Sequence, residues 1–167
     1  MGDKKITASR LRELVFYDES SGDIRWIVKK GPKNPGDLAG YLRSDGYIYI
    51  RLDGVLYSAH RIAWLYMNGS FPDSCVDHKN GIKNDNRKEN LRSASMQENM
   101  RNRGTQKNNT SGFKGVGFHK VSGRWKSSIK VNGKSIQLGF FKTPEEAHLA
   151  YCIACKKYHG EFSNTGS

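Results

Sequence analysis

One aspartate, one histidine and two asparagines are spaced so that they could do chemistry together. Asp77 and His78 are adjacent at the end of a short apolar run, and Asn90 and Asn99 follow a loop rich in Lys, Asn, Gly and Asp. Carboxylate and amide oxygens suit a hard divalent metal ion and leave coordination positions for phosphate and water. A neutral imidazole suits a general base that activates this water near pH 7. The four side chains therefore favour metal-assisted phosphodiester hydrolysis.

These residues must be positioned by a strand, a loop, a second strand and a helix. The apolar run ending at His78 indicates the first strand, the second starts at position 90 or 91, and residues 95–103 are expected to form the helix that carries Asn99. Consecutive side chains of a regular strand leave opposite faces, so we expect the geometry at Asp77 and His78 to deviate. We expect Asn90 to help fix both the hairpin and the imidazole ring.

The sequence before this region predicts short elements separated by turns. Apolar spacing changes from a helical period to alternation, and Gly, Pro, Asn and Asp interrupt it. The expected elements are a helix over residues 4–17 capped at Thr7 or Ser9, a strand over 24–28, a hairpin over 46–59 turned at Asp53-Gly54, and a helix over 60–67.

The charge balance points to a polyanionic partner. The chain has 167 residues with 28 Lys and Arg against 16 Asp and Glu, a net charge of +12. Nucleic acid is the first candidate partner and an anionic membrane the second. No apolar run is long enough to span a bilayer, and residues 1–12 lack the apolar core of a signal peptide, so we expect a cytoplasmic protein. A hydrophobic content of 36% favours small modules over one large core.

The three cysteines, Cys75, Cys152 and Cys155, do not suggest a disulfide framework, because their number is odd. Cys152 and Cys155 form a single C-x-x-C inside a helical pattern, without a second pair at zinc spacing. We interpret them as small residues near the buried face of a helix, and we expect no structural zinc.

Residues 55–103 resemble the HNH endonucleases, the ββα-metal family, in the branch found in phages and mobile introns. The matching residues are His60-Arg61, Asp77-His78-x-x-Gly81, Asn84-x-Asn86-Arg87, Asn90-Leu91-Arg92 and Asn99. The resemblance implies that Asp77 and Asn99 bind one divalent metal, Mg²⁺ or Mn²⁺. It also implies that His78 activates water and that Asn90 stabilises the active-site loop.

Several polar residues near this motif allow two interpretations. His60 could contact phosphate, or it could be a structural residue packed beside the centre, which we favour. Arg61, Arg87 and Arg92 could equally clamp phosphate or be solvated. Residues 84–86 are expected to form the loop rather than to bind a ligand, because such turns use Asn and Asp in any case.

The C-terminal residues predict a separate basic module after a linker over residues 105–111. Residues 105–167 carry 10 basic and 3 acidic side chains. Alternating segments around the Asn132-Gly133 turn indicate a three-stranded antiparallel meander. A capping box at Thr143 and Glu146 begins a helix that runs to about His159.

Residues 112–160 resemble the DNA-binding domain of plant ethylene-response factors, the Apetala-two type. The matching stretches are Gly115-Val116, Arg124-Trp125-x-x-x-Ile129, Leu138-Gly139-x-Phe141 and Thr143-Pro144-Glu145-Glu146-Ala147-x-x-Ala150-Tyr151. The resemblance implies a sheet that lies in the major groove and reads DNA with its outward residues, which here are Lys114, His119, Arg124, Lys126, Ser128, Lys130 and Gln137. Gly117, Ser122 and Ser135 depart from the Arg and Trp of the plant domains, which predicts a weaker sequence preference.

Together these features predict an α+β chain with a ββα-metal HNH nuclease core and a small three-stranded antiparallel sheet packed on one helix. Residues 1–104 would form an N-terminal extension and the nuclease domain, and residues 112–167 the DNA-binding domain. The expected function is metal-dependent cleavage of double-stranded DNA by a monomer or a dimer. Further DNA contacts are expected from Arg61, Arg87, Arg101 and Arg103. A catalytically inactive DNA-binding protein and an RNA-directed nuclease remain the alternatives.

Overall fold

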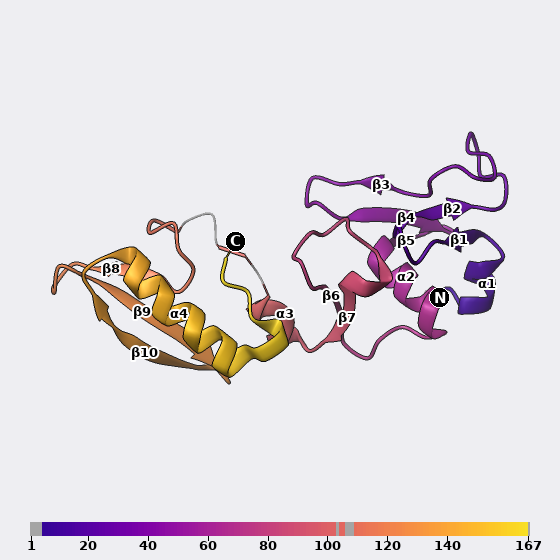
Figure 1. Cartoon of the computed structure of the whole chain (residues 1–167). Helices are drawn as coiled ribbons and strands as arrows, with labels where there is room; N and C mark the ends of the chain where they lie inside the picture. The colour runs from indigo at the N-terminus through magenta and orange to yellow at the C-terminus, as the bar shows by residue number, and fades with distance from the viewer. Residues whose placement is uncertain (1–4, 103, 106–108, 167) are drawn as a thin grey trace. The chain divides into compact units, whose positions relative to one another are not determined.

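The computed structural model of the chain describes residues 5–102, 104, 105 and 109–166. They form small antiparallel sheets and helices of mixed α+β type, as the sequence predicts (Figure 1). Internal contacts divide the chain into two compact units, Met1–Ser95 and Met96–Ser167. Residues 96–102 therefore group with the C-terminal sequence. The functional domain boundary after residue 104 stays a prediction.

The first unit combines helices with two small sheets and a hairpin. Its elements in chain order are α1 (Ala8–Arg12), β1 (Val15–Tyr17), β2 (Ile24–Trp26), β3 (Tyr41–Leu42), β4 (Ile48–Leu52), β5 (Val55–Ser58), α2 (Ala59–Asn68), β6 (Cys75–His78), the 3-10 turn η1 (Lys88–Asn90) and β7 (Leu91–Ala94). β1 pairs with β2, β3 to β5 form a meander, and β6 pairs with β7. A continuous cluster of buried side chains, including Leu11, Ile50 and Ile62, packs α1 and α2 against these strands.

The predicted helix over residues 4–17 is wrong beyond its first turns. α1 covers only Ala8–Arg12, and Thr7 caps it by accepting a hydrogen bond from Arg10 N at 3.2 Å. Val15 and Tyr17 are buried whereas Phe16 between them is exposed. This alternation is the burial pattern of a strand with one face on the core, so pairing with β2 determines the structure there.

The predicted hairpin over residues 46–59 and the helix after it are confirmed. Asp53 and Gly54 both have positive φ angles, 44° and 84°, which a two-residue turn between twisted strands requires. α2 then buries Ile62, Ala63 and Leu65 against the core. The hairpin and α2 thus place the start of the helix, where His60 lies, beside β6.

The second unit contains the predicted three-stranded meander packed on one helix. Its elements are α3 (Met96–Arg101), β8 (Val116–His119), β9 (Arg124–Val131), β10 (Lys134–Phe141), α4 (Pro144–His159) and the 3-10 turn η2 (Gly160–Phe162). The strand order is β10-β9-β8, and α4 covers one face of the sheet (Figure 1). The capping box of Thr143 and Glu146 begins α4 as expected.

The buried side of α4 includes a cysteine. Ala147, Tyr151 and Ala154 are buried, Cys155 is fully buried, and Tyr158 is 40% exposed. Cys152 is half-buried, and the three cysteines of the chain are free thiols. The interpretation of Cys152 and Cys155 as small residues near the buried face is therefore confirmed.

Candidate functional site

The hairpin of β6 and β7 positions Asp77 and His78. Its register is continuous, with Asp77 opposite Arg92 and His78 opposite Leu91. Lys79 N donates to Asn90 O at 2.8 Å and extends the pairing past the strand end. The expected irregularity at Asp77 and His78 is therefore wrong, because the ladder is complete on both sides of them. The two side chains leave opposite faces of the hairpin and have different partners.

Asp77 is held by an ion pair with its cross-strand neighbour. Arg92 Nε lies 2.9 Å and Nη2 2.8 Å from Asp77 Oδ2. The side chains are only 11% and 6% exposed for Arg92 and Asp77, respectively. Arg92, for which phosphate binding and solvation were equally expected, is thus a buried partner of the carboxylate. The pair fixes the orientation of the carboxylate at the end of the strand.

A hydrogen bond to Asn86 and two aromatic neighbours hold the His78 ring. Its Nε2 lies 3.1 Å from Asn86 Oδ1, and Asn86 is 2% exposed. The ring of His60, at the start of α2, packs edge-on against His78 with centroids 5.1 Å apart. Tyr47, which precedes β4, lies 5.2 Å from His60 and 6.0 Å from His78 between ring centroids. The favoured interpretation of His60 as a structural residue agrees with this packing.

Burial makes the protonated form of both imidazoles unfavourable. It lowers the pKa of His78 below its usual value, although the hydrogen bond to Asn86 and the charge of Asp77 act in the opposite direction. Burial lowers the pKa of His60 further, to about 3, and the neighbouring His78 and Arg61 lower it as well. Both rings are therefore neutral near pH 7.

Asn90 and Asp85 organise the loop between the two strands. Asn90 Oδ1 accepts from Asn80 N at 3.0 Å, and Asn90 Nδ2 donates to Asp85 O at 2.7 Å. Asp85 accepts from Arg87 Nε at 2.8 Å, an ion pair that is the main cause of the strongly lowered pKa of this carboxyl. The predicted role of Asn90 in fixing the hairpin agrees with these bonds, whereas the hydrogen bond to the His78 ring comes from Asn86.

Asn86 is a residue whose importance sequence reasoning missed. It was expected to be a loop former like Asn84, but it is buried whereas Asn84 is exposed. Both are Asn in the same loop, so composition and turn propensity cannot separate them. Only the structure separates them, because the backbone carbonyl of Asn86 accepts a hydrogen bond from Tyr17, which is far away in the sequence.

The two predicted metal ligands, Asp77 and Asn99, carry groups that suit a hard divalent ion better than zinc. Asp77 supplies a buried carboxylate at the hairpin end. Asn99, the second predicted ligand, lies on α3 of the second unit and supplies an amide oxygen. Within the described ranges, His, Cys, Asp and Glu side chains form no group of three or more that could hold a metal. One carboxylate and one amide fit Mg²⁺ or Mn²⁺, which keep several water ligands.

Two of the arginines expected to contact DNA, Arg61 and Arg87, have partners within the protein. Arg61 lies over the Phe71 ring with 5.3 Å between its Cζ and the ring centroid. Arg87 pairs with Glu89 at 2.9 Å as well as with Asp85. Arg103 lies outside the described residues.

The sheet of the second unit has an open face opposite α4. Along β9, Ser127 and Ile129 are buried whereas Lys126, Ser128 and Lys130 alternate with them. Neighbouring strands extend this face, since His119 pairs with Arg124 and Gln137 pairs with Ser128. These residues are the predicted outward set apart from Lys114. Gly117 leaves a hollow of about 330 Å³ on this face, lined also by His119, Lys126 and Ser128.

Phe140 joins the open face, which sequence reasoning did not foresee. The pairing of β10 with β9 shifts between Gln137 and Gly139, so Phe140 lies opposite Lys126. Its ring packs 5.0 Å from the ring of His119 between centroids. The bulge that causes this shift ends at Gly139, and an isolated glycine inside a strand pattern is its local sequence signal.

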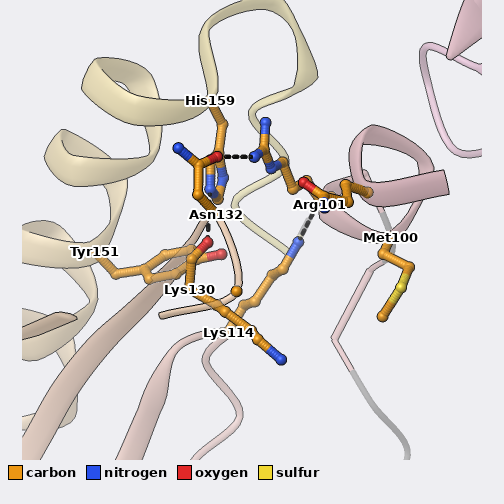
Figure 2. A pocket seen from close by; sticks show the side chains of 9 residues that line it. Met100, Arg101, Lys114, Lys130, Asn132, Tyr151 and His159 are labelled. Carbon is orange, nitrogen blue, oxygen red and sulfur yellow. Dashed lines mark hydrogen bonds between the residues drawn. The ribbon is translucent and has the colours of Figure 1, made fainter. Parts of the chain in front are cut away.

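Lys114 does not belong to the outward set, which corrects the prediction. Figure 2 shows its ammonium group pointing to the backbone of Arg101, where Nζ donates to the carbonyl oxygen at 2.8 Å. The same ammonium donates to Asn164 O at 2.9 Å, and burial lowers its pKa. Arg101 in turn donates to Asn132 Oδ1 at 3.2 Å (Figure 2). Lys114 therefore links the segment before β8 to Arg101 of α3 and to Asn164, which follows η2.

A pocket of about 330 Å³ lies beside this junction. Met100 and Arg101 line one side, and Tyr151 and His159 of α4 line the other (Figure 2). His159 is fixed by its hydrogen bond to Lys130 O at 3.1 Å.

Among the described residues, none of the helices is both long and apolar enough to cross a lipid bilayer.

Comparison with known proteins finds a match to part of the first unit and to all of α3. Residues 57–101 match the HNH endonuclease family. Protein 3.8 of Escherichia phage T7 is 36% identical to the chain over 76 residues, which are 45% of this chain and 63% of the phage protein. The chain thus covers less than two thirds of that relative. No solved structure matches, and the comparisons give no support for an ethylene-response-factor domain. The segment with the Asp77-His78 hairpin, residues 57–101, is thus similar to HNH endonuclease domains.

Proposed function

We propose that the chain is a metal-dependent endonuclease that hydrolyses phosphodiester bonds of double-stranded DNA. The observation that carries the proposal is the bond between His78 Nε2 and Asn86 Oδ1 inside the matched HNH segment. An amide oxygen only accepts, so in the neutral ring Nε2 holds the proton and Nδ1 keeps its lone pair. A buried neutral imidazole with one lone pair is suited to act as a general base.

In the proposed reaction His78 Nδ1 takes a proton from the attacking water. The water oxygen then forms a bond to phosphorus while the bond to the leaving ester oxygen breaks, and the leaving oxygen takes up a proton. Because burial lowers the pKa of His78, the ring is in its basic form at and below neutral pH. Asn90 contributes by holding the loop after His78 through its bonds to Asn80 and Asp85.

Asp77 and Asn99 are the residues that we propose to hold one divalent ion, Mg²⁺ or Mn²⁺. When bound, such an ion stabilises negative charge on the phosphate and on the leaving oxygen. Arg92 orients the carboxylate of Asp77 through its two short contacts. The HNH family match supports a divalent metal, because nucleases of this family typically use one.

The open face of the second sheet is the part of the chain that we propose to bind the DNA backbone. The proposed contacts are His119, Arg124, Lys126, Ser128, Lys130 and Gln137. Arg124, Lys126 and Lys130 on β9 are two and four positions apart and therefore share a face, which is the arrangement a row of phosphates requires. Lys114 is omitted because its ammonium group is engaged by backbone carbonyls. Contacts from Arg61, Arg87, Arg101 and Arg103 stay predictions.

Supercoiled plasmid incubated with the protein and Mg²⁺ or Mn²⁺ tests the proposal. We expect relaxed or linear DNA with metal and unchanged plasmid with EDTA. His78→Ala should abolish cleavage and retain DNA affinity, whereas His148→Ala, on α4, should cleave like the wild type. Folded protein that binds DNA but leaves the plasmid intact with both metals would show an inactive DNA-binding protein instead. Preferential cleavage of structured RNA in a competition assay would identify an RNA-directed enzyme.

A further inference from the structure

Residues before the matched HNH segment hold the loop that carries Asn86. Tyr17, the last residue of β1, is 2% exposed, and its hydroxyl donates to the backbone carbonyl of Asn86 at 2.7 Å. The two residues are 69 positions apart in the sequence. Burial raises the pKa of Tyr17, so its hydroxyl keeps its proton and remains a donor at all ordinary pH values.

The turn between β1 and β2 contacts the same loop at Arg87 and Lys88, the two residues that follow Asn86. Lys88 N donates to Glu19 O at 3.0 Å, and the side chains of Lys88 and Glu19 form an ion pair at 2.6 Å. A Cβ atom at Gly22 would lie 2.6 Å from Arg87 N and 2.7 Å from the carbonyl carbon of Asn86. Only glycine permits this approach of two backbones, and its φ of +78° also favours glycine.

A second contact from outside the matched segment reaches the His78 ring directly. Tyr47 lies in the turn before β4 and packs against both His78 and His60. Lys83, from the loop after His78, lies over the Tyr47 ring at 5.0 Å and donates to Asp45 O at 2.9 Å. The turn before β4 and the loop after His78 therefore stabilise each other through these contacts.

These contacts form a continuous path from the N-terminal residues to the general base. The hydroxyl of Tyr17 holds the backbone of Asn86, and the side chain of Asn86 holds Nε2 of His78. A fixed backbone at Asn86 holds its side chain toward the ring, and inside the loop Asn80, Asp85 and Asn90 form hydrogen bonds with one another. Tyr17 thus fixes, from outside the loop, the backbone of Asn86, whose side chain bonds the His78 ring.

We propose that residues 15–50 are a positioning element of the nuclease centre, with Tyr17 as a positioning residue that acts on His78 through Asn86. The inference rests on the proposed function. Tyr17 does not touch the reacting atoms. Its hydroxyl keeps Asn86 where it selects the ring tautomer with the proton on Nε2 and the lone pair on Nδ1. Residues 15–50, which precede the matched HNH segment, therefore help to position the general base.

Tyr17→Phe in the full chain removes the single hydroxyl and retains the ring in the core. Tyr66→Phe is the matched control, because the Tyr66 ring packs edge-on against Tyr17 with centroids 5.9 Å apart and lies on α2, away from the loop bond. Single-turnover cleavage at saturating protein gives the rate of the chemical step, and its concentration dependence gives the apparent DNA affinity. Ring ¹⁵N–¹H spectra of His78 report the tautomer independently of activity.

We expect Tyr17→Phe to lower the single-turnover rate about tenfold at unchanged apparent affinity, because the base is misplaced while DNA contacts remain. The His78 spectrum should change from one tautomer to a mixture, and Tyr66→Phe should match the wild type in both measurements. A wild-type rate and tautomer in Tyr17→Phe would overturn the inference, and so would equal losses in both variants, which indicate packing alone. If the wild type fails to cleave, the proposed function fails, and the tautomer comparison still decides the positioning role.

Discussion

The guanidinium of Arg92 and the carboxylate of Asp77 form a buried cross-strand ion pair, with Nε and Oδ2 2.9 Å apart. Both side chains are almost fully shielded from water, so removal of one partner leaves the other charge uncompensated. We predict that Arg92→Gln lowers the free energy of unfolding in EDTA by about 3 kcal/mol. Denaturant titration with and without EDTA measures this loss.

The same variant tests Asp77 as a metal ligand. A divalent ion can replace the lost positive charge, so Mn²⁺ should raise the melting temperature of Arg92→Gln more than that of the wild type. The control is Asp77→Asn combined with Arg92→Gln, which should be more stable than Arg92→Gln in EDTA and should not respond to Mn²⁺. An equal response of the three proteins to Mn²⁺ contradicts the assignment of Asp77.

Gly22 offers a steric test of the contact between the β1–β2 turn and the catalytic loop. Gly22→Ala places a methyl group against the backbone of Asn86 and Arg87 in addition to straining its own φ angle. Gly31→Ala is the control, because Gly31 also has a positive φ, +58°, but a Cβ there has no atom within 4 Å. We predict that Gly22→Ala loses about 1–3 kcal/mol of stability and most cleavage activity. Gly31→Ala should lose only the strain contribution and should cleave normally.

Local sequence signals predicted much of the fold and the place of the Asp77-His78 pair at the end of a strand. The Thr143 capping box, the turn at Asp53-Gly54 and the Asp77-His78 pair depend on neighbours within a few positions, so spacing alone reveals them. Val15 was assigned wrongly because pairing with Trp26 overrides its helical spacing. Propensity is a weak prior wherever a tertiary partner decides the structure.

The misassigned functional residues share a dependence on distant contacts. Asn86 is distinguished from Asn84 by burial and by Tyr17, and Lys114 is turned inward by carbonyls of Arg101 and Asn164, 13 and 50 positions away. No pattern within a single strand or loop encodes such partners. A basic residue at an outward position of an alternating segment is therefore a weaker predictor of a DNA contact than the alternation suggests.

The lowered pKa of His60 predicts that stability falls with acidity. The pKa of His60 is about 3 in the folded state and near 6.5 in the unfolded chain. Between these values the unfolded chain binds a proton at His60 and the folded chain does not. The stability is complete above pH 6.5 and is lost as pH falls toward 3, by up to about 1.4 kcal/mol per pH unit. The lowered pKa of His78 acts in the same direction. His60→Phe should reduce this slope in denaturant titrations at pH 7.5, 6 and 5, and an unchanged slope would contradict the assignment.

Lys126 and Lys114 provide a comparison of a proposed DNA contact with an internal lysine. Lys126 lies on the open face of the sheet, so Lys126→Ala should weaken binding to all duplex sequences alike and reduce the slope of log affinity against log salt by about 0.9. Lys114→Met should lower the melting temperature, because it removes the bonds to Arg101 and Asn164. At a temperature where that variant is folded, its salt slope should equal that of the wild type. Fluorescence anisotropy at four salt concentrations measures the slopes, and a reduced slope in Lys114→Met with an unchanged one in Lys126→Ala would reverse the assignment of the two lysines.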